Sequence, residues 1–214
     1  SLRGLGPVHT ALIWNGFNIQ SSMNGQADFN LISPLLFDNF ALQPGSGNAL
    51  WGSSAAGGSL HIGSTDSCSQ ISTSQSIGSW NMYTGAVRAA LVRKKFSLSF
   101  RAFRQYALNN YLYRDPSTPN HTLRNQANAE LRHFATMGKQ KFSTGKNKLL
   151  TLTVWSKKGQ RQIPPLVTTP LAFANQYDNL LRSAVNWSVE TGNSTIQIRS
   201  AYFREKIHYR DSLA

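Results

Sequence analysis

Residues 39–63 read NFALQPGSGNALWGSSAAGGSLHIG, and this is the most informative stretch of the chain. Its pattern predicts a short strand at Phe40–Leu42, a glycine-rich turn, a compact turn of small residues at Ala49–Ala56 and a second strand at Ser59–Ile62. Glycine adopts positive φ angles without a steric penalty, so the Gly-Gly pair before the second strand permits a sharp change of direction. We therefore expect a small, tightly turned sheet here.

The residues before this stretch extend the same small unit. His9–Ile13 predicts a strand, and the Asn15-Gly16 pair that follows it favours a tight turn. A polar loop at Gln20–Gln26 leads to Leu31–Phe37, which predicts a short helical turn with a proline near its start. The pattern is typical of a compact α+β unit.

Charge divides the chain into two parts. The 214 residues carry a net charge of +13, yet up to Asp66 there is one basic residue, Arg3, against three aspartates. Gly, Ser, Asn and Ala dominate before this point, whereas Arg, Lys and alternating apolar residues dominate after it. We therefore expect domains at 1–66 and 67–214. Because the positive charge is confined to one part and interleaved with apolar residues, a nucleic-acid partner is not expected.

The second part repeats an alternation of apolar and polar residues with a period of two. The segments are Ser69–Ile77, Asn81–Val92, Phe96–Gln105, Ala127–Met137, Leu149–Trp155, Leu181–Val189 and Ile196–Tyr202. Such repeated alternation predicts antiparallel strands with one apolar face. No apolar run approaches the roughly 20 residues that a membrane-spanning helix needs.

The arginines in the middle of these segments share the polar side of the alternation. A guanidinium on the lipid face of a barrel strand costs roughly 2–4 kcal/mol at the bilayer midplane, whereas a position in the lumen costs little. We therefore expect a lumen-facing set, with Glu130 on the same side: Arg88, Arg101, Glu130, Arg132, Arg182 and Arg199. The apolar side contains many Ala and Gly residues, which lipid tolerates better than the packed core of a soluble sandwich.

The connections between the segments alternate in length. Arg93–Lys95 and Glu190–Asn193 are short, whereas Asn109–Asn125 and Lys157–Asp178 are long. Transmembrane barrels have short periplasmic turns and longer extracellular loops. If the first strand rises from the periplasm, all the long loops are extracellular. Aromatic residues near the strand ends are typical of an interfacial girdle.

Four motifs in residues 1–63 resemble the plug domain of TonB-dependent outer-membrane receptors. They are Arg3-Gly4; TALIWNGF at 10–17, with Asn15 and Gly16; GQADFNLI at 25–32, with Gly25 and Asp28; and the stretch with Leu50, Gly52, Gly57 and Gly58. The Trp-Asn-Gly form is most similar to cobalamin-receptor-like members. Gln43-Pro44-Gly45 replaces the usual Arg-Gly-Pro, which puts in doubt the salt bridge that this arginine makes with the barrel wall.

The resemblance implies a mainly β fold, in which a partial α+β plug is followed by antiparallel meander strands of an incomplete transmembrane β-barrel. Such receptors have about 22 strands, so the chain is expected to be an internal fragment without the TonB-contacting box. The implied location is the bacterial outer membrane, and the implied partners are its lipid and the TonB complex. The implied function is import of an iron–siderophore or a corrinoid. The implied substrate contacts in the apical loop are Ser21, Ser22, Met23 and Asn24.

Motifs of catalytic chemistry are missing from the sequence. There is no H-E-x-x-H pattern, the single cysteine is Cys68, and the five histidines are scattered, so we expect no enzyme, no metal and no cofactor. One alternative is a soluble basic β-sandwich that binds polyanions. Another is a porin or adhesin without a plug, which deletion of residues 1–63 would not affect. A carbohydrate-active enzyme is disfavoured because the carboxylates are few.

Overall fold

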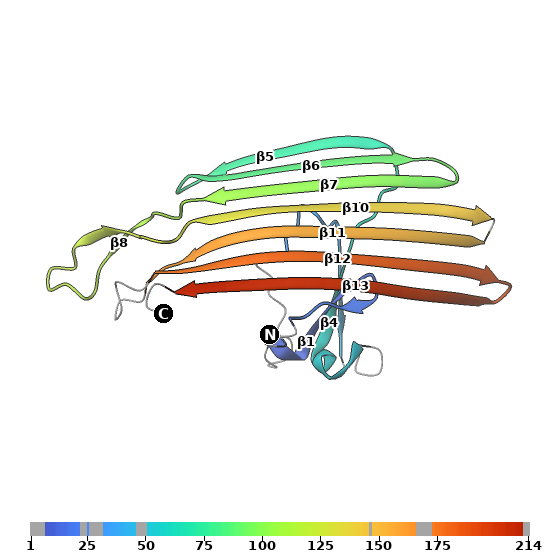
Figure 1. The fold of residues 1–214 in the computed structure, drawn as a ribbon, viewed down its shortest axis with the longest axis horizontal. Coiled ribbons are helices and arrows are strands. Elements are labelled where there is room, and N and C mark those ends of the chain that lie inside the picture. The colour runs from blue at the N-terminus through green and yellow to red at the C-terminus, as the bar shows by residue number, and fades with distance from the viewer. Residues whose placement is uncertain are drawn as a thin grey trace.

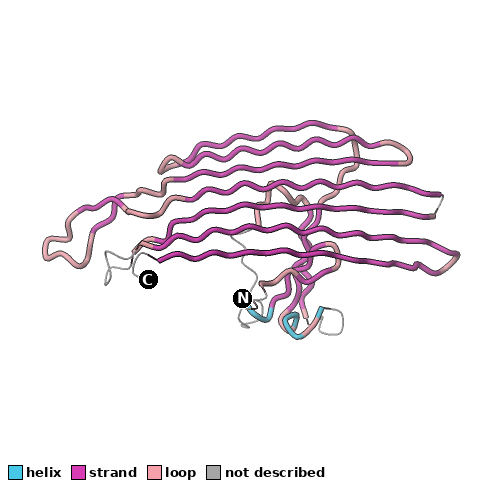
Figure 2. The backbone as a smooth tube through the Cα atoms, viewed as in Figure 1, coloured by secondary structure: helices cyan, strands magenta, loops and turns pink. Residues whose placement is uncertain are grey.

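The computed structural model describes residues 7–21, 25, 32–45, 51–145, 147–165 and 173–211. They form a four-stranded sheet, a seven-stranded sheet and a two-stranded hairpin. Figure 1 shows the long strands of the large sheet lying side by side, with the small sheet near the middle of their length. Figure 2 shows that strands make up almost all of this architecture. No helix within the described ranges is long and apolar enough to cross a membrane.

The small sheet has the strand order β2-β1-β4-β3. Its strands are β1 (Thr10–Trp14), β2 (Phe17–Asn18), β3 (Asn39–Pro44) and β4 (Gly58–Gly63). Strand β1 is parallel to β4 and antiparallel to β2, and β3 is antiparallel to β4. Asn15 and Gly16 have φ angles of 50° and 82°, as expected for the two central residues of a tight hairpin turn.

The helical turn predicted before β3 differs from what the structure contains. Leu31 lies outside the described residues, and residues 34–36 form a turn in which the backbone N–H of Leu36 donates to Ser33. Three-residue 3₁₀ turns occur instead at Pro7–His9 and Ser53–Ala55.

The large sheet, here called the wall, is an antiparallel meander. Its strands are β5 (Gln70–Gly78), β6 (Met82–Val92), β7 (Phe96–Ala107), β10 (Leu131–Gly145), β11 (Lys148–Ile163), β12 (Ala174–Thr191) and β13 (Ser194–Asp211). Their order is β13-β12-β11-β10-β7-β6-β5, so the sheet does not close within the described residues. The predicted fold class, mainly β with an incomplete barrel, is confirmed.

Several wall strands are longer than predicted. Strand β10 continues past the predicted end at Met137 to Gly145, while β11 extends to Ile163 and β12 begins at Ala174, both within the loop predicted at 157–178. Lysines and glycines interrupt the apolar alternation in these stretches, which hid the period of two. The predicted loop at 109–125 contains a further hairpin, β8 (Leu112–Arg114) with β9 (Leu123–Asn125).

The small sheet packs against one face of the wall, here called the inner face. The register of the strands places six residues in one row across this face: Arg88, Arg101, Met137, Trp155, Arg182 and Phe203. Trp155 is 1% exposed, and its ring centroid lies 5.7 Å from that of Trp14 and 5.1 Å from that of Phe37. A mixed aromatic and aliphatic core thus joins the two sheets.

The opposite face of the wall, the outer face, presents an apolar band. Exposed residues of this band include Val87, Leu98, Phe100, Val154, Val185 and Ile198. They alternate along their strands with residues that face the small sheet, as the sequence predicts for a wall between two different environments.

Arg132 corrects one of the expected face assignments. The register pairs Arg132 with Tyr106 and places it on the outer face, whereas its neighbours Ala135 and Met137 are buried against the small sheet. The lumen-facing placement of Arg132 is therefore wrong, as is that of Glu130, with which it forms an ion pair. The alternation predicted the wrong face for Arg132 because the apolar residues of β10 fill the core between the sheets rather than facing lipid.

Candidate functional site between the small sheet and the wall

Arg88 and Arg101 form the centre of a charged contact between the two sheets. They lie directly opposite each other on the antiparallel strands β6 and β7, and both side chains leave the inner face. Two like charges at opposed positions repel each other, so the pair needs anions between or above it. The anions come from the segments that flank the small sheet.

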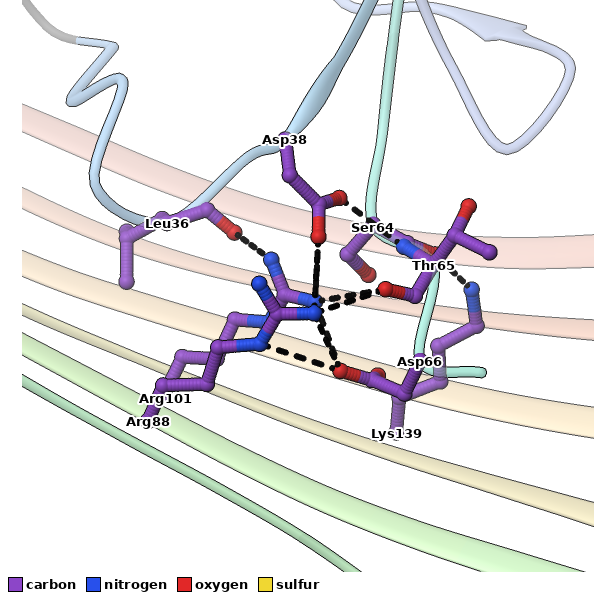
Figure 3. Close-up of polar contacts among 8 residues, drawn as sticks. All are labelled: Leu36, Asp38, Ser64, Thr65, Asp66, Arg88, Arg101 and Lys139. Atoms are coloured by element: carbon purple, nitrogen blue, oxygen red, sulfur yellow. Dashed lines mark hydrogen bonds and ion pairs between the residues drawn. The ribbon is translucent and has the colours of Figure 1, made fainter. Parts of the chain in front are cut away.

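Asp38 precedes β3, Asp66 follows β4, and both carboxylates lie against the two guanidinium groups. Nη2 of Arg101 donates to Asp38 at 3.0 Å and to Asp66 at 2.9 Å. Nη2 of Arg88 lies 2.9 Å from each of the same two carboxylates. Figure 3 shows the guanidinium groups side by side with the two carboxylates converging on them. This four-residue ion cluster consists of two cations from the wall and two anions from the small unit.

Backbone groups complete the ion cluster. Nη1 of Arg101 donates to the carbonyl of Leu36 at 3.1 Å, and Nη2 of Arg88 donates to the carbonyl of Thr65 at 2.8 Å. The N–H of Thr65 donates to Asp38 at 2.9 Å, and Nζ of Lys139 donates to the carbonyl of Ser64. The wall therefore holds both the segment before β3 and the segment after β4.

Two of the four charged side chains in the ion cluster are buried. The Arg101 and Asp66 side chains are 2% and 5% exposed, whereas Arg88 and Asp38 are partly exposed. Burial alone would raise the pKa of Asp38, but hydrogen bonds from Arg101 and from the Thr65 backbone hold this pKa below its ordinary value. Burial acts the same way on Asp66, where Ser99, Arg88 and Arg101 outweigh it and lower the pKa. Both carboxylates are therefore ionised at neutral pH.

Arg182 makes a second polar contact, and strands β10 and β11 separate it from the ion cluster. Its Nη2 donates to the carbonyl of Ile19 at 3.3 Å, and its Nε donates to Glu205 at 2.7 Å. The guanidinium also lies over the ring of Trp155, at 4.8 Å from the centroid. Arg182 thus ties the end of the β1–β2 hairpin to the aromatic core.

Arg199 lies beside the tight turn of the small sheet. A Cβ built on Gly16 would be 2.4 Å from Nη1 of Arg199, so the turn backbone and this side chain are in close contact. Asn15, Gly16 and Arg199 border a cavity of about 380 Å³, which Lys139 and Lys141 also line. The cavity is a polar space between the two sheets.

The remaining predicted site residues are only partly described. Ser21 borders a small cavity with Ile19 and Arg182. Gly57 donates its N–H to His9, and Gly52 and Gly58 have positive φ angles beside the turn before β4, while Gly25 also has a positive φ. The following predicted residues lie outside the described ranges: Arg3, Gly4, Ser22, Met23, Asn24, Asp28 and Leu50.

Asp38 and Asp66 are the functional candidates that sequence reasoning missed. The missing arginine at Gln43-Pro44-Gly45 put a salt bridge between plug and wall in doubt, yet the structure has one with the charges exchanged. The available signal was weak, since Asp66 stands at the composition boundary and Asp38 lies among apolar residues. Within the described ranges, no group of His, Cys, Asp and Glu residues could hold a metal ion.

A comparison with family models finds a match in the first part of the chain. The family model described as "TonB-dependent Receptor Plug Domain" matches residues 1–59. These residues match the plug domain of TonB-dependent receptors. The recognition of this receptor family from the sequence is confirmed, and the small sheet with its flanking segments is from here on called the plug.

The solved structures with a similar fold cover the plug and the wall together. "Copper transporter OprC" matches 99% of this chain and 41% of its own, with a TM-score of 0.62 and 13% identity. The "siderophore receptor PirA from Acinetobacter baumannii" matches 95% of this chain and 38% of its own, with a TM-score of 0.56 and 13% identity. The chain thus spans about two fifths of the length of these structures. No curated protein matches the sequence.

The plug match and the fold together remove the alternatives to a receptor. A soluble sandwich requires two large packed sheets, whereas the described residues form one large sheet with a small plug sheet against it. A porin or adhesin without a plug is contradicted by the plug match over residues 1–59. The family and the fold indicate the bacterial outer membrane, and they indicate a receptor rather than an enzyme.

Proposed function

We propose that the protein imports a bulky, scarce nutrient across the outer membrane by a movement of the plug that the TonB complex drives. No covalent bond is made or broken in this function. The ion cluster supports the proposal most directly, because Arg88 and Arg101 bind plug segments on both sides of β3 and β4 without any covalent link. A contact made of ion pairs and hydrogen bonds can separate and re-form when the plug is pulled.

The energetic cost of this separation fits a gated transporter. Breaking a buried ion pair by removing one partner costs roughly 3–5 kcal/mol, because the other charge stays buried. Water that enters along the lumen would solvate both charges as the plug moves, which lowers this cost. The cavity beside Arg199 and Lys139 offers a polar space in which such hydration can begin.

For the transported ligand we propose an iron–siderophore, with a corrinoid as the second candidate. PirA is described as a siderophore receptor and shares this fold, which favours the first. OprC is described as a copper transporter, so a copper ion belongs in any test. We further propose that Ser21, Ser22, Met23 and Asn24 contact the ligand from the plug.

Uptake by cells tests this function. The full-length protein is expressed in cells without a related receptor, and uptake of a labelled ferric siderophore, a labelled corrinoid and copper is measured with and without TonB. We expect energy-dependent uptake of one ligand, and loss of that dependence when residues 1–63 are deleted. Unchanged energy-dependent uptake after this deletion would contradict the proposal.

A further inference from the structure

Three cations gather on the outer face of the wall, on the side that carries no plug. They are Arg104 on β7, Arg132 on β10 and Lys158 on β11, which are neighbouring strands. The register places Arg104, Phe134 and Lys158 in one row and Arg132 in the next row toward the loops. Adjacent strands lie about 5 Å apart, so the three charged groups form a triangle within reach of one another's long side chains.

A groove of about 940 Å³ runs between these two rows. Its walls are side chains of the outer face, and we define the outer groove by Arg104, Tyr106, Arg132, Phe134, Lys158 and Tyr177. Asp178 borders the groove with its backbone, while its side chain is on the inner face and accepts a hydrogen bond from Gln176. The groove is thus cationic, with aromatic groups beside the cations.

The charge balance of the outer groove favours an anion. Among the described residues, Glu130 is the carboxylate near the groove on this face, and it pairs with Arg132. The guanidinium of Arg132 also lies 5.7 Å from the centroid of the Tyr106 ring, which orients it along the groove. Arg104 and Lys158 are exposed, and no ion pair of either residue occurs among the described contacts.

The position of the groove along the wall strands indicates its depth in the membrane. From the turn at Arg93–Lys95 to Arg104, β7 spans about nine residues, which at the usual rise and tilt corresponds to about 25 Å, the height of the apolar band of such barrels. Between these two levels the outer face carries exposed apolar residues such as Leu98 and Phe100. The outer groove therefore lies where lipid headgroups meet the barrel, at the end with the long β8–β9 hairpin.

We propose that the outer groove binds the phosphate groups of a glycolipid in the outer leaflet. Arg and Lys side chains form short, charge-assisted hydrogen bonds with phosphate oxygens, and tyrosine belts lie at headgroup depth. Two phosphates on one headgroup match three cations spread over neighbouring strands. The inference rests on the membrane location in the proposed function, but it makes no assumption about the transported ligand.

Binding to a defined lipid tests the proposal. The probe is purified bisphosphorylated lipid A, added to the full-length protein in neutral detergent, with affinity and melting temperature as readouts. We expect R104Q/R132Q/K158Q to weaken binding by about tenfold or more, because three charge-assisted contacts are lost. The matched control R93Q/K94Q/K95Q removes the same charge at the other end of the wall and should bind as the natural protein does.

Control ligands and control variants show whether the phosphates and the three cations are responsible for binding. Dephosphorylated lipid A should not raise the melting temperature, and inorganic phosphate alone should not either; an equal rise with either one would overturn the proposal. Equal weakening by the control variant would also overturn it. If the triple variant fails to fold, R104K/R132K keeps the charges and should retain binding, and its loss of binding would count against the groove. Because these measurements use detergent, they are independent of the uptake test.

Discussion

Arg101 carries its charge at a position where 2% of its side chain reaches solvent. Such burial is tolerable because two carboxylates and a backbone carbonyl accept its hydrogen bonds. Arg88 shares the two carboxylates from a more exposed position. At this scale, the attachment of the plug depends on a few atoms whose partners come from segments far apart in the sequence.

Replacing Arg101 tests how much this contact contributes. Arg101→Met keeps an unbranched apolar stem but leaves Asp66 buried with one cationic partner fewer, so we expect a loss of roughly 3–5 kcal/mol in the free energy of unfolding. Urea unfolding of the full-length protein in detergent measures it. Arg93→Met, in an exposed turn, is the matched control and should change little. Equal stability of the two variants would contradict the role of the ion cluster.

The pKa values of Asp38 and Asp66 predict how stability depends on pH. Both pKa values are lowered in the folded protein from an ordinary value of 3.8, so folding favours the ionised carboxylates. Their contribution is fully present above the unfolded pKa and is lost as the pH falls through the lower, folded pKa. We expect stability to fall steeply below about pH 4. Asp66→Asn should flatten this fall, and an unchanged pH profile in that variant would exclude Asp66 as its source.

The hairpin of β1 and β2 is the element most sensitive to a single backbone angle. Gly16 has a φ of 82° and lies against Arg199, so a side chain here meets both strain and a neighbour. Gly16→Ala should destabilise the protein by about 1–2 kcal/mol, mostly through the left-handed backbone, since Arg199 can turn aside. Gly16→Asn should cost less, because asparagine tolerates this conformation. Thermal unfolding ranks the two variants, and the reverse order would contradict the turn assignment.

Within four residues, strand β11 presents one side chain to the outer face of the wall and another to the polar cavity. Val154 is 48% exposed on the outer face, whereas Thr151 borders the polar cavity with Lys139 and Lys141. Val154→Asp should impair membrane insertion by about 2 kcal/mol, while Thr151→Asp gains cationic neighbours and should be tolerated. The heat-dependent mobility of the folded protein on gels reports insertion. Equal tolerance of both variants would mean that the outer face does not contact lipid.

The period-two patterns predicted which segments form wall strands. They were less successful for the ends of these strands and for the contacts that their side chains make. On β7, the alternation of Leu98 and Phe100 with Ser99 and Arg101 assigns the two faces correctly, because lipid and the plug demand different chemistry there. On β10 it fails, since the core between the sheets also demands apolar residues such as Met137. The partners of the arginines were not predictable, because they depend on how plug segments are placed across the wall.

The whole molecule combines a plug and a wall that meet through one face only. The inner face holds the ion cluster, the aromatic core around Trp155 and the polar cavity at Arg199, while the outer face combines an apolar band with the outer groove. These faces differ because one is covered by protein and water and the other by lipid. The division accounts for the positive charge of the wall without a nucleic-acid partner.

Spin labels along β7 test this division most directly. In a Cys68→Ser background, single cysteines from Ser97 to Phe103, except at Arg101, are labelled in the full-length protein in bilayers. Collision rates with oxygen, which dissolves in lipid, and with a water-soluble nickel chelate are then measured. We predict that labels at 98, 100 and 102 favour oxygen, whereas labels at 97, 99 and 103, where Arg101 is kept, are shielded from it by the plug. Equal oxygen accessibility at both sets of positions would mean that the wall has no separate lipid and plug faces.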